Sequence, residues 1–280
     1  MSATVHAALT VTDSRGNTVM LEAPAQRIIT LSPHAAELVF AAGAGANLVA
    51  VSEHSDTPPA VKTLPIIGNA NALDLERIIA LKPSLIVLPS YLSVKQQQSL
   101  RARNIALYIA DAPTPEAIAD DIEALGVLSG HEVAARVYAQ RYRAQLKGIA
   151  AVRSDAGAPV SVFYQLWESP LYTIGGDSLI NRAITHCGGR SIFSTLIAPA
   201  PVVLREAVIA ARPQVIIMGA SEQDFTRWKN SWQRWPQIPA VRHQVFIRVD
   251  PDLLHRPGPR FIEGMATLCE ALRQDRTRSR

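Results

Sequence analysis

The fold is decided by two similar stretches of sequence, ERIIALKPSLIV at residues 76–87 and EAVIAARPQVII at residues 206–217. They align without a gap at an offset of 130 positions, and the glutamate, one isoleucine, one alanine, the proline and a second isoleucine coincide. In each stretch the proline separates a helical segment from an apolar run, because helices usually end at or before the residue that precedes a proline. A helix–proline–strand unit that recurs in this way predicts two similar lobes.

Short apolar runs, which are typical of buried parallel strands, alternate with helical segments in both halves of the chain. In the first half we expect strands at 27–31, 48–52, 85–88 and 106–109 and helices at 36–42, 75–81 and 94–103. In the second half we expect strands at 160–164, 215–218 and 245–248 and helices at 178–186 and 260–273. This alternation predicts an α/β protein with two Rossmann-like lobes and mainly parallel sheets.

A long helical segment lies between the two halves. Gly130 ends one helix, and residues 131–152 form a second that would span roughly 33 Å at about 1.5 Å per residue. It carries few large apolar residues, which favours a connecting helix over a further layer of a sheet. The expected organisation is a hairpin in 1–24, an N-terminal lobe in 25–130, a connecting helix in 131–154, a C-terminal lobe in 155–272 and a tail in 273–280.

Composition excludes several classes of function. The chain has 280 residues, of which 48% are hydrophobic, enough for sizeable cores. Its net charge is +4. The basic residues are scattered along the chain apart from the C-terminal tail, whereas a nucleic-acid binder gathers them on one face. No apolar run is long enough to span a membrane. The N-terminus lacks a complete signal peptide, so either a signal was removed or the protein is cytosolic.

No motif of a catalytic class is present: we find no GxSxG, no P-loop and no HExxH. The segment DLLHRPGPR at residues 252–260 follows a predicted strand, and ligands of open α/β sheets lie beyond the carboxyl ends of strands. Asp252 and Arg256 are therefore candidates for a ligand clamp. The alternative is a capped turn with a surface salt bridge. The sequence favours a binding protein over its rival, a cytosolic Rossmann-like enzyme.

Four further candidates for ligand binding, His34, His54, Tyr91 and Trp167, also follow predicted strands. The two histidines could join a metal site with residues of the 252–260 segment, although single histidines more often form hydrogen bonds, and we expect no protein-held metal. Tyr91 and Trp167 could stack on a flat ligand or pack in the core of their own lobe.

Glu76 and Glu206 lie in the first turns of the two repeated helices. They could complement the helix dipole, or each lobe could present one carboxylate to arginines of a symmetric partner. Cys187 and Cys269 are the two cysteines of the chain. They would be paired in a secreted protein and free in a cytosolic one.

Together these residues resemble the class III periplasmic binding proteins of ABC importers, and within that class most closely the vitamin B12-binding group. The resemblance runs from about Arg27 to Leu272. It rests on the segments IITLSP at 28–33, VSEHSDTPP at 51–59, LERIIALKP at 75–83, HCGG at 186–189, RE at 205–206 and RPGPR at 256–260.

The resemblance implies two lobes joined by one long helix in a monomeric receptor without an intrinsic cofactor. It implies that Glu76 and Glu206 dock onto arginines of a transmembrane permease dimer. It also implies a disulfide between Cys187 and Cys269, and hence a periplasmic location. Asp252 and Arg256 match positions that contact the side chains of a corrinoid.

Some positions depart from the family's pattern. Ala70, Pro89 and Ala200 stand where the family's cobalamin binder has tryptophans, and His54 stands where it has a tyrosine. Trp167 and Tyr91 could compensate from nearby. We expect a cobalamin-like corrinoid as the ligand, with heme or a ferric siderophore as the alternative within the class and a metal ion as a further one. The stretch GNAN at residues 68–71 lacks the tyrosine that heme binders of this class use, which weighs against heme.

Overall fold

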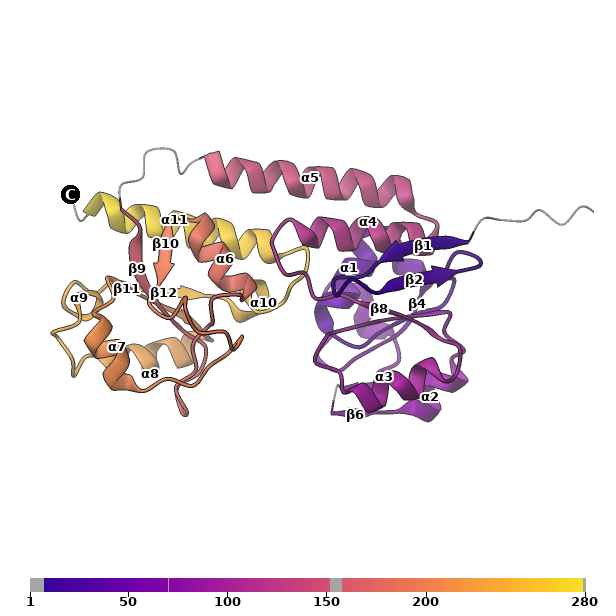
Figure 1. Ribbon diagram of the computed structural model, residues 1–280, viewed down its shortest axis with the longest axis horizontal. Helices are drawn as coiled ribbons and strands as arrows, with labels where there is room; N and C mark the ends of the chain where they lie inside the picture. The colour runs from indigo at the N-terminus through magenta and orange to yellow at the C-terminus, as the bar shows by residue number, and fades with distance from the viewer. Residues whose placement is uncertain (1–7, 70, 152–157, 279–280) are drawn as a thin grey trace, which may run out of the picture. The chain divides into compact units, whose positions relative to one another are not determined.

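The structure is a computed structural model that describes residues 8–69, 71–151 and 158–278 (Figure 1). The chain divides into two compact units. The N-terminal unit comprises residues 1–112, 116–143 and 257–259, and the C-terminal unit comprises 113–115, 144–256 and 260–280. No described helix combines the length and the apolar character that crossing a membrane requires.

The N-terminal unit is built on a four-stranded parallel sheet with the order β4-β3-β7-β8. Its strands are β3 (Ile28–Thr30), β4 (Leu48–Val51), β7 (Leu85–Leu88) and β8 (Ala106–Ile109). Its helices are α1 (Pro33–Ala41), α2 (Leu75–Ala80), α3 (Val94–Arg101) and α4 (Ala117–Ser129), with 3-10 turns at Gly45–Asn47 and Pro59–Thr63. Two small antiparallel pairs complete the unit: β1 (Leu9–Thr12) with β2 (Thr18–Leu21), and β5 (Gly68–Asn69) with β6 (Ala72–Leu73).

The turn between β1 and β2 is anchored to the unit through a buried carboxylate. The Ser14 hydroxyl donates to Asp121 of α4 over 2.7 Å, and the Tyr108 hydroxyl of β8 donates to the same carboxylate over 2.6 Å. Burial raises the pKa of Asp121 to about 6, although both hydrogen bonds act in the opposite direction. The hairpin that the sequence predicts is therefore attached to the core of its unit.

The C-terminal unit is built on a second four-stranded parallel sheet with the order β10-β9-β11-β12. Its strands are β9 (Val160–Gln165), β10 (Gly189–Ser191), β11 (Val215–Gly219) and β12 (Phe246–Val249). Its helices are α6 (Leu179–His186), α7 (Arg205–Ala211), α8 (Glu222–Trp232), α9 (Pro239–Arg242), α10 (Pro251–Leu254) and α11 (Phe261–Arg278). A disulfide joins Cys187, just after α6, to Cys269 in α11, which confirms the expected pairing.

The long helix α5 (Glu132–Ala151) confirms the helix expected over 131–152, within the residues that the structure describes. The division between the two units falls inside it, after Arg143. On the N-terminal side, Arg143 pairs with Asp120 and Glu123 of α4 at 2.6 and 2.8 Å. α4 ends at Gly130, whose φ of 75° lies in the left-handed region that glycine adopts without strain.

The two sheets confirm the α/β fold with two similar parallel sheets. β7 and β11, the strands of the repeated sequence, begin at residues 85 and 215 and occupy the third position of their sheets. Some elements were not expected. β10 begins at Gly189, where we expected only the end of a helix, α8 and α9 lie in a segment without a prediction, and α10 occupies part of the expected loop. The expected domain boundaries stay a prediction, and their residues 1–7, 152–157 and 279–280 lie outside the described residues.

Candidate functional site

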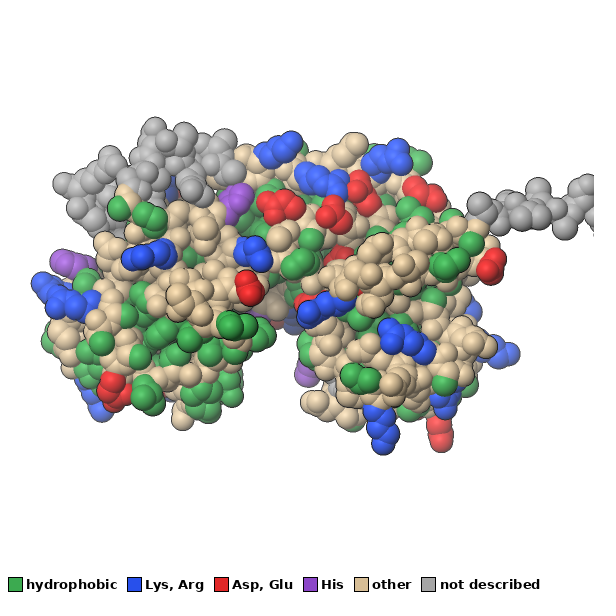
Figure 2. All heavy atoms as spheres, in the orientation of Figure 1, with side chains coloured by type: hydrophobic (Ala, Val, Ile, Leu, Met, Phe, Trp, Pro, Cys, Tyr) green, Lys and Arg blue, Asp and Glu red, His purple; other side chains and the backbone are tan. Residues whose placement is uncertain are grey.

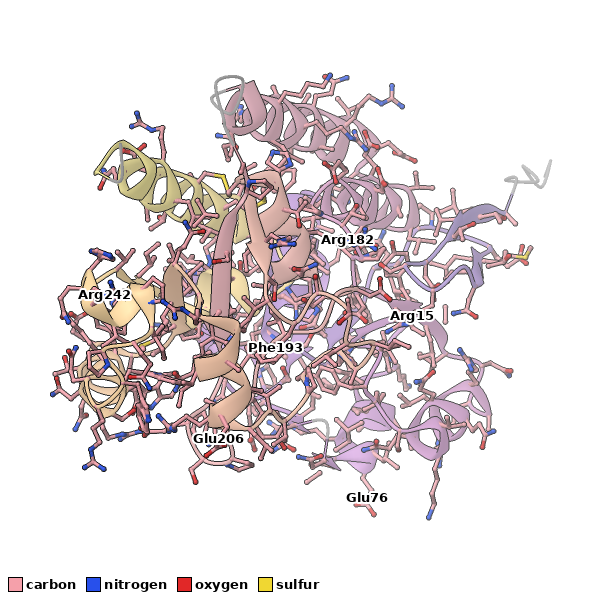
Figure 3. All side chains as sticks on the ribbon, turned by 60° about the vertical axis from the view of Figure 1, so that its left-hand side comes forward. Arg15, Glu76, Arg182, Phe193, Glu206 and Arg242 are labelled. Atoms are coloured by element: carbon pink, nitrogen blue, oxygen red, sulfur yellow. A yellow bond between two sulfur atoms is a disulfide. The ribbon has the colours of Figure 1, made fainter. Side chains whose placement is uncertain are left out.

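Glu76 and Glu206 are exposed in the first turns of α2 and α7. Figure 3 shows each of them at one end of its own unit. The start of α2 is fixed by Asp74, whose carboxylate accepts a hydrogen bond from the Arg77 amide at 2.9 Å. Neither glutamate forms an ion pair or a side-chain hydrogen bond with any described residue. Each carboxylate is thus open to a partner from outside the chain.

An apolar surface lies beyond the end of β9 in the C-terminal unit. Trp167, Tyr172 and Val202 are linked by antiparallel β-bridges, so their side chains stand on one face. We call these three residues the Trp167 surface. The indole of Trp167 is 57% exposed, and its ring lies edge-to-face against the buried Trp228 at 6.2 Å. Leu204 and Ile197 on the same segment are also exposed.

Figure 2 shows hydrophobic side chains gathered on this part of the C-terminal unit. Exposed apolar residues that gather on one face often mark a ligand or partner site. Trp167 was expected from the sequence as a candidate, whereas Val202 and Leu204 were not. The signal for them was the alternation in the segment APAPVVL at residues 198–204, which is short and interrupted by prolines.

Asp252 and Arg256 lie together at 2.8 Å as a salt bridge across one helical turn. The segment forms α10 rather than an irregular loop, because Asp250 caps it by accepting from the Asp252 amide at 2.9 Å. This is the geometry of the capped-turn alternative. The role of the pair as a ligand clamp stays a prediction.

His255, between these two residues, points into its own unit. Its Nε2 lies 3.0 Å from the Tyr164 hydroxyl, and burial lowers the pKa of His255 to about 4, so the imidazole is neutral near pH 7. A Cβ added at Gly219 would lie 2.2 Å from the same nitrogen, which shows how closely β11 packs against the ring. His255 is therefore a partly buried residue that packs within the C-terminal unit.

His34 is buried in the N-terminal unit, with only 5% of its surface exposed. Its Nε2 lies 3.0 Å from the Ala110 carbonyl oxygen and 3.3 Å from the Ser32 hydroxyl. His34 lies in the first turn of α1, and its ring reaches the residue that directly follows β8. Its proposed contact with a ligand stays a prediction, and the structure shows a hydrogen-bonding role.

His54 and Tyr91 are both exposed in the N-terminal unit. His54 follows β4 and Tyr91 follows β7, and the carboxyl ends of parallel strands meet at one edge of a sheet. The His54 loop is held by Asn69, whose amide donates to Glu53 at 2.8 Å. Tyr91 has 69% of its surface exposed, so the alternative that it packs in the core is wrong for this residue.

The positions that depart from the family's pattern lie in different environments. Pro89 is buried in the N-terminal unit, Ala200 is exposed beside the Trp167 surface, and Ala70 lies outside the described residues. Among the residues that the structure describes, no group of three or more histidine, cysteine, aspartate or glutamate side chains is arranged to hold a metal ion.

Comparison with known proteins identifies the family. The sequence model of the periplasmic binding protein family matches residues 28–253. The chain belongs to the periplasmic binding protein family. It is 35% identical to the vitamin B12-binding protein of Vibrio campbellii over 88% of this chain and 89% of that protein. It is 34% identical to the vitamin B12-binding protein of Photorhabdus laumondii over 88% of this chain and 87% of that protein.

Solved structures agree with this membership. The crystal structure of the periplasmic vitamin B12-binding protein of Vibrio cholerae matches with a TM-score of 0.83 and 33% identity, over 90% of this chain and 98% of that one. A periplasmic heme-binding protein of Roseiflexus matches with a TM-score of 0.78 and 23% identity, over 89% of this chain and 98% of that one. The second likeness shows the shared fold alone.

Proposed function

We propose that this protein is the periplasmic receptor of an ABC importer, and that it binds a cobalamin-like corrinoid and delivers it to a membrane-embedded permease dimer. The observation that carries the proposal is the 35% identity to a vitamin B12-binding protein over 88% of the chain. We assign the protein no catalytic residue, because the role of such a receptor is to bind its ligand and release it unchanged.

The exposed apolar residues of each unit support a bulky, flat ligand. A corrinoid has a broad ring that is largely apolar on its faces and carries amide side chains around its rim. The Trp167 surface supplies apolar rings of the C-terminal unit for such a ligand, and Tyr91 is an exposed ring of the N-terminal unit. Asp252 and Arg256 would hydrogen-bond the amide side chains and so fix the orientation of the ring.

Calorimetric titration with cyanocobalamin tests the ligand. At a protein concentration of about 50 μM, a receptor with a submicromolar dissociation constant gives a sharp one-to-one transition. Absence of binding heat, together with absence of a shift in the melting temperature, would remove corrinoids from this proposal. A parallel titration with hemin asks whether the protein instead takes the ligand of its heme-binding structural relatives.

The exposed carboxylates of Glu76 and Glu206 support docking onto a cationic partner. Each lies in the first turn of its helix without an ion pair to any described residue, and carboxylate–arginine pairs are strong at protein interfaces. The variant with Glu76→Lys and Glu206→Lys should lose uptake of cyanocobalamin while keeping its affinity for it. Glu263→Lys is the matched control, since Glu263 is exposed in the first turn of α11. Lost ligand affinity in the double variant would mean that the two glutamates serve the ligand site.

A further inference from the structure

A pocket opens in the C-terminal unit between the start of α7 and the end of α8. It is lined by Arg205, Asn230, Ser231, Arg234 and Trp235, and its volume is about 460 Å³. We call it the Arg205 pocket. The helices that border it pack on a common core through Val208 of α7 and Trp228 and Trp232 of α8.

The Arg205 guanidinium is held in place by two aromatic rings. Its central carbon lies 4.5 Å from the ring centroid of Trp232 and 4.9 Å from that of Trp235. Trp232 is itself fixed, since it is buried and its indole nitrogen donates to the Gln165 side chain at 2.7 Å. A guanidinium that stacks on aromatic rings is oriented in advance, so less conformational entropy is lost when it binds a carboxylate.

Two arginines, Arg205 and Arg234, line the pocket. Neither Arg205 nor Arg234 forms an ion pair with a described residue, and Nη1 of Arg205 is buried without a hydrogen-bond acceptor among them. Burial lowers the pKa of the Arg205 guanidinium, although the carboxylates of Glu168 and Glu206 act in the opposite direction. A buried donor without an acceptor costs free energy, and an incoming anion would supply the missing acceptor.

The pocket adjoins one of the two proposed docking carboxylates. Arg205 directly precedes Glu206 in the first turn of α7. In the repeated sequence, the position that precedes Glu76 is Leu75, so the N-terminal unit has no counterpart of this arginine. The C-terminal docking face therefore combines an exposed acid with a basic pocket beside it.

We propose that the Arg205 pocket receives a carboxylate side chain of the same permease subunit that Glu206 contacts. The inference rests on the proposed function, because it names a second contact at the docking face. Arg205 would bind the carboxylate through two parallel N–H donors, and Arg234 would neutralise it from the turn that follows α8. Glu206 and the pocket together would then recognise a partner surface on which a basic and an acidic side chain lie next to each other.

Affinity for the importer tests the inference. The dissociation constant between the full-length receptor and the purified permease–ATPase complex of the host bacterium's vitamin B12 importer, in lipid nanodiscs, is measured by biolayer interferometry. Arg205→Met and Arg234→Met should each weaken docking at least tenfold. Arg242→Met is the matched control, since Arg242 is an exposed arginine of the same unit without an ion pair to a described residue, and it should dock as the wild type does.

Each outcome decides one point. If both pocket variants dock like the wild type, the inference is wrong. If only Arg205→Met weakens docking, it is also wrong, because Arg205 then merely positions Glu206, whereas Arg234 on the other side of the pocket cannot do so. If Arg205→Met fails to fold in a melting experiment, Arg234→Glu decides, and it should weaken docking more than Arg234→Met.

The failure of this inference can be told apart from the failure of the proposed function. Glu206→Gln is measured in the same assay, and all variants are titrated with cyanocobalamin. If Glu206→Gln docks like the wild type, the proposed docking face is itself wrong. If Glu206→Gln weakens docking while the arginine variants do not, the docking face stands and only the pocket is wrong.

Discussion

Lys82 and Arg212 adopt the same left-handed backbone conformation 130 positions apart, with φ angles of 46° and 49°. Arg212 is the C-cap of α7, Lys82 follows the C-cap of α2, and each precedes a buried proline. A left-handed conformation is unfavourable for residues with a Cβ, so two independent helix ends would not be expected to share it. The repeat thus extends from the sequence to the backbone, at the position where each helix turns into its strand.

Glycine at these two positions should stabilise the protein. Lys82→Gly and Arg212→Gly each relieve the strain of the left-handed backbone. This gain outweighs the extra conformational entropy that glycine gives the unfolded chain, so the free energy of unfolding should rise by about 0.5–1 kcal/mol. Urea denaturation should show a higher midpoint. Ala210→Gly inside α7 is the control and should lower the midpoint, because its backbone is helical. A lower urea midpoint for both the Lys82→Gly and the Arg212→Gly variants would show that neither position is strained.

The disulfide between Cys187 and Cys269 should contribute substantially to stability. It closes a loop with a sequence separation of 82, for which the chain-entropy model gives about 4–5 kcal/mol. Replacing both cysteines with serine should lower the free energy of unfolding by an amount of this order and reduce the urea midpoint. The control is the wild type with its disulfide reduced by dithiothreitol, and its urea midpoint should fall by a similar amount. Unchanged midpoints in both samples would contradict the prediction.

The buried carboxylate of Asp121 should make stability depend on pH. Its pKa in the folded protein is raised from 3.8 to about 6, chiefly by burial, so between about pH 4 and pH 6 the folded state holds a proton that the unfolded state has released. The free energy of unfolding should therefore fall as the pH rises through this window.

The Asp121→Asn variant tests the origin of this dependence. It keeps an acceptor for Tyr108 and Ser14 but cannot titrate, so the fall between pH 4 and pH 6 should be smaller than in the wild type. Asp177→Asn, at an exposed position, should retain the wild-type profile. Identical profiles for all three proteins would assign the pH dependence to other groups.

The ring of Trp167 should contribute to ligand affinity. If a corrinoid covers the Trp167 surface, Trp167→Ala removes an aromatic contact worth about 1–2 kcal/mol, or roughly 5- to 30-fold in the dissociation constant for cyanocobalamin. Calorimetry provides the measurement. Val133→Ala, at an exposed apolar position on α5, is the control and should bind like the wild type. Equal affinity of the Trp167→Ala variant would place the ligand elsewhere.

The sequence predicts much of the fold because the strong signals are local. Pro83 and Pro213 mark where helices give way to strands, and the apolar runs that follow them form the third strand of each sheet. β10 was missed because its residues Gly189–Ser191 are polar or small, and only pairing with β9 makes them a strand. Its existence depends on tertiary contacts that no local pattern records.

The candidate site was harder to predict because exposure is a property of the folded chain. His34 and His54 both follow strands, yet the first is buried against Ala110 and the second is exposed. Tyr91 and Trp167 could have packed in a core, and the structure leaves both rings exposed. The stacking of Arg205 on Trp232 joins residues that are far apart in the chain, so no sequence motif predicts it.

Competition between ligands tests the central claim most directly. The oxidised protein is mixed with equimolar cyanocobalamin and hemin and examined by native mass spectrometry under non-denaturing conditions. A receptor for corrinoids should appear as a complex with one cyanocobalamin, and the complex with hemin should be minor. A dominant hemin complex, or a protein that remains free of both ligands, would contradict the account.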